Sequence, residues 1–492
     1  PLTYIIVEEP TNGTITISDN IVIYTPDTDY FGEDSFRFKV NDGVQNSNTA
    51  TVTINVGCIL DDENIQEAVD LWISDQAAAE EAYGNISDWD TACITDMSEL
   101  FQDYAEFNDD ISGWNTSNVT TMFRMFYNAT SFNQDISGWD ISNVTTLSAM
   151  FHNADAFNQP IGSWDVSNVT DMSLLFNFAS SFNQDLGGWN VSSVTNMSLM
   201  FRSSPFNYDI GGWDVSNVTL MSEMFQGNGN FNQDISNWNV SSVEQIDQMF
   251  RLATSFNQDI SNWDVSSVWN MRWVFNSATA FNQNIGSWNT FDVTTFQSMF
   301  EGATAFNQDI GSWDLSGNGG TGYYPDGTTA SSSSPFGQMF KDATAFNQDL
   351  SGWCVSNRSE PSDFSTGSAL TSANSPLWGK EFTIALTSGS QTQTVTATTA
   401  ITPIQYTVTT ICTTTLSVSA SNLPSGVSAA LNNNIATISG SPAGTATGTF
   451  NYSLTVSGST TVQTVTGTIN VSSSASSTTL VPCSGSLSLS SG

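Results

Sequence analysis

Carboxylates are the most abundant ionisable side chains in this sequence. The 492 residues include 48 Asp and Glu, nine Lys and Arg, and a single histidine, His152. Hydrolysis of a glycosidic bond needs a pair of carboxylates, so a polysaccharide-acting enzyme is one hypothesis. These carboxylates recur at a fixed interval, however, and an active site should interrupt a repeat. Without a Gly-rich phosphate loop, Cys/His metal spacing or nucleophile elbow, the sequence favours a protein that is not an enzyme.

Two groups of aspartates offer the hard oxygen ligands that Ca²⁺ prefers. The first lies near the N-terminus and contains Asp27, Asp29, Asp34 and Asp42. The second recurs once per repeat, and carboxylates one strand apart repel each other unless cations or Asn residues separate them. Calcium is therefore a possible cofactor, but solvated acidic surfaces explain both groups at least as well. The recurring row is Asn115, Asp140, Asp165, Asn190, Asp214, Asn239, Asp264, Asn289 and Asp314.

A second recurring row of aspartates has a different expected role. Its members precede the repeated tryptophans by four residues, where short side chains commonly cap turns by bonding to nearby backbone. We therefore predict that this row caps turns. The row is Asp110, Asp135, Asp185, Asp209, Asp234, Asp259, Asp309 and Asp349.

Aromatic side chains are the other candidate binding groups. Trp269 and Trp273 lie outside the regular tryptophan series and are predicted to be exposed. Tyr323 and Tyr324 lie in a Gly/Ser-rich insert of 15 extra residues, and inserts in repeat proteins emerge as loops, often on the binding face. An insertion that is merely tolerated is the alternative.

These candidate groups are positioned by a repeat of about 25 residues. Its form is Phe-Asn-Gln-Asp-Ile-x-x-Trp-Asp-Val-Ser-Asn-Val-Thr-x-Met-Ser-x-Met-Phe, and the interval is 25 except for 24 before Trp213 and 40 before Trp353. Such a period predicts a solenoid whose coils bury their apolar sides against each other, with the tryptophans in the core rather than serving as a platform for sugars. The tryptophans are Trp89, Trp114, Trp139, Trp164, Trp189, Trp213, Trp238, Trp263, Trp288, Trp313 and Trp353.

The spacing of apolar residues within one coil predicts its local structure. Ile136, Trp139 and Ile141 have the spacing of a short strand, since the last two are alternate residues. Apolar residues from Val144 to Phe157 then recur at three- and four-residue steps, which is helical or 3₁₀ spacing. We therefore predict a leucine-rich-repeat-like solenoid with a short strand and a short helix in each coil, over residues 85–380.

The N-terminal region, residues 1–57, is predicted to form a β-sandwich. Its apolar and polar residues alternate with period two, and turn signals such as Asn12-Gly13 and Asp42-Gly43 separate the runs. The expected strands are Tyr4–Val7, Thr14–Ile17, Ile21–Tyr24, Ser35–Val40 and Thr49–Val56.

Residues 58–84 are predicted to form a helical cap over the first coil. Between Asn64 and Tyr83 the apolar residues follow a helical period, and solenoids need such caps to cover the end of their core. These apolar positions are Ile65, Ala68, Val69, Trp72, Ile73, Ala77 and Ala82.

The C-terminal region changes composition. From Phe382 onward no charged residue occurs, and β-branched runs predict a β-sandwich over residues 381–471, followed by a linker or the start of another module over 472–492. The runs are Gln393–Ala397, Ile404–Val408, Thr415–Val418, Ile435–Ser439, Phe450–Val456 and Val462–Val471.

Cysteines and net charge restrict the environment and the partners. The five cysteines suggest two pairs, Cys58 with Cys93 and Cys412 with Cys483, leaving Cys354 unpaired; isolated thiols are the alternative.

A formal net charge of −39 repels nucleic acid and anionic membranes, which excludes both as expected partners. No stretch approaches the roughly 20 apolar residues of a membrane-spanning helix, so membrane insertion is not expected.

The repeat resembles the leucine-rich-repeat variant of BspA-like bacterial surface proteins, with Trp and Val in place of Leu, over residues 59–379. Residues 24–43 are similar to cadherin-like domains of bacterial adhesins. The segments Leu423–Val427 and Ile438–Pro442 resemble immunoglobulin-like modules of large secreted Bacteroidetes proteins.

These resemblances imply a segment of a larger adhesin or appendage at the extracellular cell surface, exported by type IX secretion. The solenoid would bind a protein or glycan on another cell, and the β-sandwiches would act as spacers. The alternative is a fibre subunit whose partners are copies of itself.

Overall fold

The computed structural model describes residues 2–18, 21–28, 30, 32–315, 335–356 and 358–474. The chain forms two compact units, one of Pro1–Gln348 with Pro361–Ser372 and one of Asp349–Glu360 with Ala373–Gly492. Asp29, Tyr323, Tyr324 and Cys483 lie outside the described residues. Within the described residues, no helix is long and apolar enough to cross a membrane.

The N-terminal domain contains the five strands that alternation predicted. Strands β1, β4 and β5 form one antiparallel sheet, and β2 and β3 form a second. The buried Asp34 carboxylate connects the two sheets, because it accepts hydrogen bonds from the backbone N–H groups of Thr11 and Asn12 and from the Tyr24 hydroxyl, at 2.9–3.0 Å. The strands are Thr3–Glu8 (β1), Gly13–Ser18 (β2), Ile21–Pro26 (β3), Gly32–Asn41 (β4) and Ala50–Val56 (β5).

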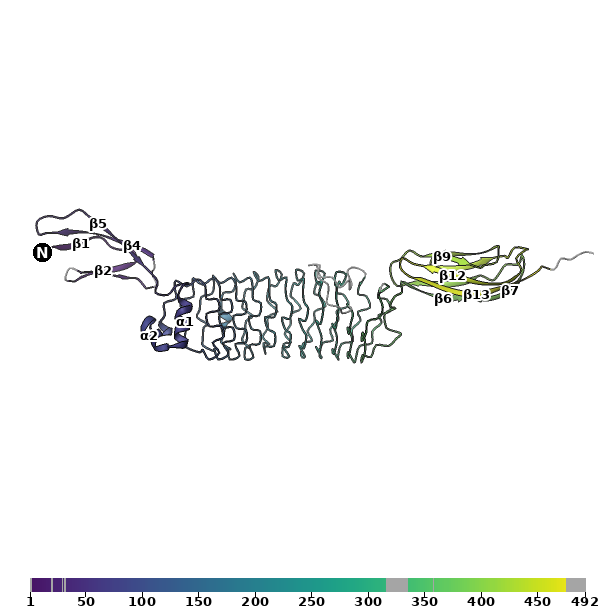
Figure 1. Ribbon diagram of the computed structural model, residues 1–492, viewed down its shortest axis with the longest axis horizontal. Helices are drawn as coiled ribbons and strands as arrows, with labels where there is room; N and C mark the ends of the chain where they lie inside the picture. The colour runs from purple at the N-terminus through teal and green to yellow at the C-terminus, as the bar shows by residue number, and fades with distance from the viewer. Residues whose placement is uncertain are drawn as a thin grey trace, which may run out of the picture. The chain divides into compact units, whose positions relative to one another are not determined.

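The predicted cap is present, as two helices instead of one. Helix α1 (Ile65–Ser74) ends at Asp75, whose side chain accepts a hydrogen bond from the Ala78 N–H and so starts helix α2 (Gln76–Tyr83). Trp72 packs edge-on against Trp89, the first tryptophan of the repeat, at 6.0 Å between ring centroids. The two helices lie at the start of the coil stack, where they cover the end of its core (Figure 1). Because the helix breaks, Ala77 and Ala82, predicted for the apolar face, are exposed instead; Ile73, near the end of α1, is exposed as well.

The coils themselves are stacked side by side in chain order (Figure 1), but the predicted strand and helix within each coil are wrong. In the described coils from Ile86 to Leu315, the backbone consists of tight turns, with 3₁₀ segments only at Ile86–Asp88 and Ile161–Ser163. Each coil joins the next through one parallel β-bridge, in a column that includes Thr121, Thr146 and Asp171.

Alternating hydrogen bonds explain why helical spacing here gives no helix. The N–H groups of Met150 and His152 donate to carbonyls three residues earlier in the same coil. The N–H groups of Ala149, Phe151 and Asn153 donate instead to the next coil, at 2.8–3.0 Å. An α-helix would use all of these donors internally and leave none to join coils.

Left-handed backbone makes this alternation possible. Two residues per coil have positive φ, for example Ala149 and Asn153, both at 55°. This conformation costs about 1–2 kcal/mol for an L-residue with a side chain, and it is least compatible with β-branched side chains. Accordingly, no Val, Ile or Thr occupies either column in the coils between Trp89 and Leu315.

The core of the coil stack consists of continuous aromatic columns, as the repeat predicted. The ladder tryptophans (those of the regular series from Trp89 to Trp353) are all buried, with at most 4% of their surface exposed. Each indole from Trp114 to Trp313 donates its Nε1–H to the carbonyl of an Ile or Leu in the preceding coil, as Trp139 does to Ile111. Phenylalanines stack beside them, with 5.4–5.8 Å between successive rings from Phe101 to Phe300.

The C-terminal domain is a two-sheet structure, as predicted for residues 381–471. One sheet has the order β10-β11-β8-β6 and the other β7-β13-β12-β9, around a core that includes Tyr406 and Tyr452. Strands β6 and β10 were not among the predicted runs. The strands are Phe382–Ser388 (β6), Thr392–Thr396 (β7), Ile404–Thr410 (β8), Ser417–Ser421 (β9), Val427–Asn432 (β10), Ile435–Gly440 (β11), Gly448–Ser457 (β12) and Val462–Ser472 (β13).

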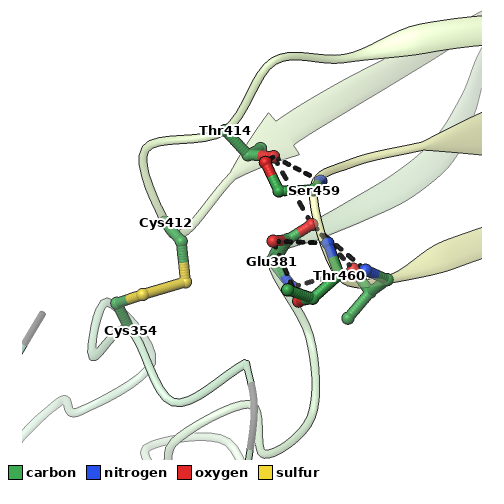
Figure 2. Close-up of a disulfide and its surroundings, with 7 residues drawn as sticks. Cys354, Glu381, Cys412, Thr414, Ser459 and Thr460 are labelled. Atoms are coloured by element: carbon green, nitrogen blue, oxygen red, sulfur yellow. Dashed lines mark hydrogen bonds between the residues drawn. A yellow bond between two sulfur atoms is a disulfide. The ribbon is translucent and has the colours of Figure 1, made fainter.

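Two disulfides are formed, and one of them corrects the predicted pairing. Cys58 bonds to Cys93, as expected, and joins the segment before α1 to the first coil. Cys354 bonds to Cys412, so Cys354 is not unpaired and Cys412 is not bonded to Cys483 (Figure 2). Sequence proximity favoured the wrong pair, because it could not show that the loop after β8 lies beside residue 354.

Candidate functional site

Four columns of the repeat differ in residue type among the coils, although the first of them is Ser in five of the nine. They lie nine, ten, thirteen and fourteen residues after each ladder tryptophan, whereas the residue twelve after it is Phe in every coil from Trp89 to Trp288. We call these columns the variable face. They are Ser98, Phe123, Ser148, Ser173, Ser198, Ser222, Asp247, Arg272 and Gln297; Glu99, Arg124, Ala149, Leu174, Leu199, Glu223, Gln248, Trp273 and Ser298; Gln102, Tyr127, His152, Asn177, Arg202, Gln226, Arg251, Asn276 and Glu301; and Asp103, Asn128, Asn153, Phe178, Ser203, Gly227, Leu252, Ser277 and Gly302.

The backbone joins these columns into one surface. The columns ten and fourteen residues after the tryptophan are the left-handed positions, and their N–H groups bond to the next coil, as Asn128 does to His152. Large apolar side chains on this face remain exposed, with 39% of Phe178 and 45% of Leu252 accessible. After the insert, Gln338, Lys341 and Asp342 continue the same columns, because Gly302 donates to the Lys341 carbonyl.

Cations and aromatic rings are concentrated on the variable face. Five of the nine Lys and Arg residues of this very acidic chain lie here: Arg124, Arg202, Arg251, Arg272 and Lys341. In a chain with a formal charge of −39, this face therefore carries most of the positive charge.

One aromatic group on this face centres on His152. Its ring stacks on Tyr127 at 4.3 Å and meets Phe178 edge-on at 6.1 Å, while the Asn177 amide bonds to Nδ1 at 3.0 Å. Burial, with the charges of Arg124 and Arg202, lowers the pKa of His152 below its usual 6.5. The imidazole is therefore neutral at pH 7, so the amide donates and Nδ1 accepts.

A second group centres on Trp273. The guanidinium groups of Arg272 and Arg251 lie 4.1 and 5.2 Å from the centroid of its indole, within the range of cation–π attraction. Arg251 also donates to the Gln248 side-chain oxygen at 2.9 Å. Two guanidinium groups are thus held beside one ring.

Other cations of this face are paired with carboxylates. Arg124 lies 3.6 Å from Glu99, Arg202 lies 3.4 Å from Glu223, and Lys341 lies 3.2 Å from Glu301. Burial raises the pKa of Glu223 above its ordinary value, and Asp247 adds to that rise, while the nearby arginines oppose it.

Unsatisfied polar atoms also gather on the variable face. Buried polar groups in proteins nearly always have a hydrogen-bond partner, so atoms that lack one indicate a place for a ligand or water. Among the described residues, six buried atoms of this face have no partner: Gln102 Oε1, Arg124 Nε, Asn177 Oδ1, Gln226 Oε1, Arg251 Nε and Arg272 Nε.

The predicted exposed aromatics have different outcomes. Trp273 lies on the variable face and is half-buried rather than fully exposed, because the two arginines cover it. Trp269 is also half-buried, and its backbone carbonyl accepts hydrogen bonds from the N–H and the hydroxyl of Thr294. Tyr323 and Tyr324 fall in the insert, outside the described residues.

The repeated aspartates cap turns. In the row predicted to do so, each described Oδ1 accepts from the N–H two residues later, as Asp135 does from Ser137 at 3.0 Å. That prediction is confirmed. The row predicted as a possible calcium site makes the same bond at Asp140, Asp165, Asp214 and Asp264, each from a Ser N–H. Hydrogen bonding by the side chain of that Ser, and then by its N–H, lowers the pKa of these carboxyls.

The aspartates proposed to bind calcium are not gathered into a cluster. Asp34 is occupied by protein donors, and Asp42 accepts from the N–H groups of Val44 and Gln45. The Asp27 N–H donates to the Asn12 carbonyl, and Asp314 lies in the repeated row. In the part of the chain that the structure describes, no group of three or more His, Cys, Asp or Glu residues could hold a metal ion.

The arginines of the variable face are functional candidates that motif reasoning missed. Arg124, Arg202, Arg251 and Arg272 belong to no short motif and recur at no fixed step. A signal was nevertheless present: aligning the coils on their tryptophans shows which positions depart from an otherwise uniform repeat.

Comparisons with known proteins agree with this division of the chain. A family model described as bacterial Ig domain matches residues 1–55, where the sequence resemblance had implied a cadherin-like domain. No curated protein matches the sequence. Among solved structures, an endo-fucoidan hydrolase from glycoside hydrolase family 107 is similar over 19% of this chain and 15% of that chain, at 16% identity and a TM-score of 0.16. That likeness is too slight to indicate a shared fold.

The repeat region gives the broader match. The family model described as Mycoplasma protein of unknown function, DUF285, matches residues 72–189, 175–271, 221–321 and 328–378. These repeats, a bacterial Ig domain and two disulfides are consistent with an extracellular surface protein. The chain belongs to the DUF285 family.

Proposed function

We propose that this chain is a non-enzymatic segment of a BspA-like bacterial adhesin, and that it attaches to its target through the variable face of the solenoid. The two β-domains serve as spacers, and type IX secretion is the expected route to the surface. The target is a protein or glycan on another cell.

The observation that carries this proposal is the concentration of arginines, exposed aromatic rings and unsatisfied polar atoms on one face of the repeat. Core columns keep the same residue type because each ring must stack on its neighbours. The turn-capping columns keep Asp or Asn, except at Pro160 and Cys354, because these side chains bond to a nearby N–H. The variable face lies outside both sets of columns, and there the chain places its arginines, exposed aromatics and unsatisfied polar atoms.

The absence of enzymatic activity is also proposed. The repeated carboxylates are engaged in local hydrogen bonds, and their lowered pKa values suit acceptors of hydrogen bonds better than general acids. His152 is enclosed between rings and hydrogen-bonded to Asn177. A screen of the full chain against polysaccharides should detect no hydrolysis, and activity that disappears on substitution of two specific carboxylates would contradict this proposal.

The attachment proposal is tested with the full chain on arrays of glycans and extracellular proteins. A variant with Phe178→Ser and Leu252→Ser removes exposed apolar groups of the variable face and should weaken binding several-fold. The matched control, Asp185→Ser with Asp234→Ser, changes the capped turns and should leave binding intact. Absence of binding to any surface, or equal loss in the control, would overturn the proposal.

Self-assembly into a fibre is a second candidate function. In the N-terminal domain the aliphatic side chains of Ile5, Val7, Ile21 and Ile23 are 38–62% exposed. Exposed apolar groups along strands favour pairing with another copy. Sedimentation of the full chain over a wide concentration range decides this: growing assemblies support the fibre, and a strict monomer excludes it.

A further inference from the structure

We propose that the variable face binds an acidic polysaccharide, and that Arg251 and Arg272, assembled on Trp273, form the site for its carboxylate or sulfate groups. This inference rests on the proposed attachment function and adds the chemical class of the ligand and the residues that recognise it.

The arrangement of these three residues suits an oxyanion. Guanidinium groups present donors in a planar fork that matches the oxygens of a carboxylate or sulfate. Stacking on the indole, at 4.1 and 5.2 Å from its centroid, restrains both arginines before any ligand arrives. Less conformational entropy is then lost on binding, which favours affinity.

The donors of this pair are incompletely used within the described residues. Arg124, Arg202 and Lys341 form ion pairs with glutamates, whereas no ion pair joins Arg251 or Arg272 to a described carboxylate. The Nε atoms of both lack an acceptor in the same part of the chain. An incoming anion would therefore not have to displace an ion pair.

Charge alone would suggest that an acidic chain avoids acidic ligands. At physiological ionic strength, however, exposed charges farther apart than roughly 8 Å are largely screened. The ligand then responds mainly to nearby groups, and beside Trp273 these are the guanidinium groups of Arg251 and Arg272, part of whose charge is offset by Glu223.

A polysaccharide fits the face better than an acidic peptide. Side chains of the face recur once per coil, and stacked rings of successive coils lie 5.4–6.4 Å apart. A sugar unit spans a comparable length, but so do alternate side chains of an extended peptide, about 6.6 Å apart, so the preference for a polysaccharide rests on the exposed ring surface. Phe178, 39% exposed farther along the same face, offers ring surface for the apolar face of a further sugar.

The test measures binding of the full chain to alginate, dextran sulfate, neutral dextran and poly-glutamate by biolayer interferometry. Alginate and dextran sulfate distinguish carboxylate from sulfate as the recognised group. We expect at least one of them to bind and dextran not to bind. The double variant Arg251→Gln with Arg272→Gln should weaken that binding on the order of tenfold or more.

Two controls separate recognition from general electrostatics. Arg37→Gln with Lys39→Gln removes the same charge from the N-terminal domain and should change affinity less than twofold. Arg251→Lys with Arg272→Lys keeps the charge but loses the planar fork, so it should give an intermediate loss. Thermal melting of each variant shows whether it remains folded. If the glutamine variant is unfolded, the loss of binding is measured with the lysine variant instead.

Several results would overturn the inference. These are equal binding of dextran, no effect of either arginine variant, equal loss in the N-terminal control, or tighter binding of poly-glutamate than of both acidic polysaccharides. If the acidic polysaccharides fail but another array ligand is lost in the Phe178/Leu252 variant, the attachment function stands and only the ligand class is wrong.

Discussion

At the scale of single residues, the tryptophan of each coil combines burial with one specific hydrogen bond. Trp189 is 3% exposed, and its Nε1–H donates to the Ile161 carbonyl of the preceding coil at 3.1 Å. Phenylalanine would fill part of the same space without the donor, which explains why this column is Trp in every coil.

We expect Trp189→Phe to lower the free energy of unfolding by roughly 2–4 kcal/mol, from the unsatisfied carbonyl and the lost volume. Urea denaturation measures the change. Trp273→Phe, outside the ladder, is the matched control and should cost much less. A similar cost at both positions would mean that the indole hydrogen bond is unimportant.

In the C-terminal domain, Glu381 likewise combines burial with specific hydrogen bonds. Only 3% of it is exposed, and its carboxylate accepts bonds from the N–H and hydroxyl groups of Thr460 and Thr461, in the loop between β12 and β13 (Figure 2). Burial raises its pKa, but these hydrogen bonds outweigh burial, so the pKa lies below the ordinary 4.5.

A carboxyl group whose pKa is lower in the folded state than in the unfolded state stabilises the fold at pH values above the unfolded-state pKa. This stabilisation is lost as the pH falls through the folded-state pKa. We therefore expect Glu381 to stabilise the full chain at pH 7 and to lose this effect below about pH 4.5. The difference in Tm between wild type and Glu381→Gln should shrink as the pH is lowered from 7 to 3. A constant difference would contradict this role.

At the scale of elements, the coil shows which features a sequence can predict. Period, coil boundaries, buried tryptophans, the cap and most strands of the two β-domains follow from apolar spacing, because burial of a column is repeated in every coil. The helix predicted between Val144 and Phe157 was wrong, because a spacing of three and four residues also fits consecutive turns. The left-handed residues determine which N–H groups bond to the next coil. The residue types at these positions are too varied to predict a left-handed backbone from the sequence.

The candidate site had a similar limit. Trp273 could be selected from the sequence because it breaks the tryptophan series, but its partners Arg251 and Arg272 come from two coils and two different columns. Their meeting depends on the stacking of coils, so the cluster was not predictable from spacing within one repeat. Cys354 and Cys412 were paired wrongly for the same kind of reason.

The left-handed columns allow a direct test of the coil backbone. Leu174 has a φ of 59°. Leu174→Gly should keep or raise stability, because glycine adopts this conformation freely, whereas Leu174→Val should lower it by about 1–2 kcal/mol. Thermal or urea unfolding of the two variants gives the comparison. Equal tolerance of valine and glycine would rule out a left-handed residue at this position.

At the scale of the whole molecule, acidic rows one coil apart act against stability. Hydrogen bonds from serine lower the pKa of Asp140 and of Asp259. The neighbouring carboxylates Asp165 and Asp234 oppose this by raising the pKa of Asp140 and Asp259, respectively, by a smaller amount. With a net charge of −39, such repulsion is repeated along the stack. We expect Tm to rise by several degrees between 10 and 500 mM NaCl, since salt screens the repulsion. A Tm that falls with NaCl would contradict this expectation.

The central claim is that a uniform scaffold of stacked rings displays one variable binding face. Hydroxyl-radical footprinting of the full chain, with and without a ligand found on the arrays, tests it most directly because the method locates contacts by residue. We expect ligand-dependent protection of Tyr127, Phe178, Leu252 and Trp273, with the capped turns and both β-domains unchanged. Protection confined to the turns or to the β-domains would contradict the account.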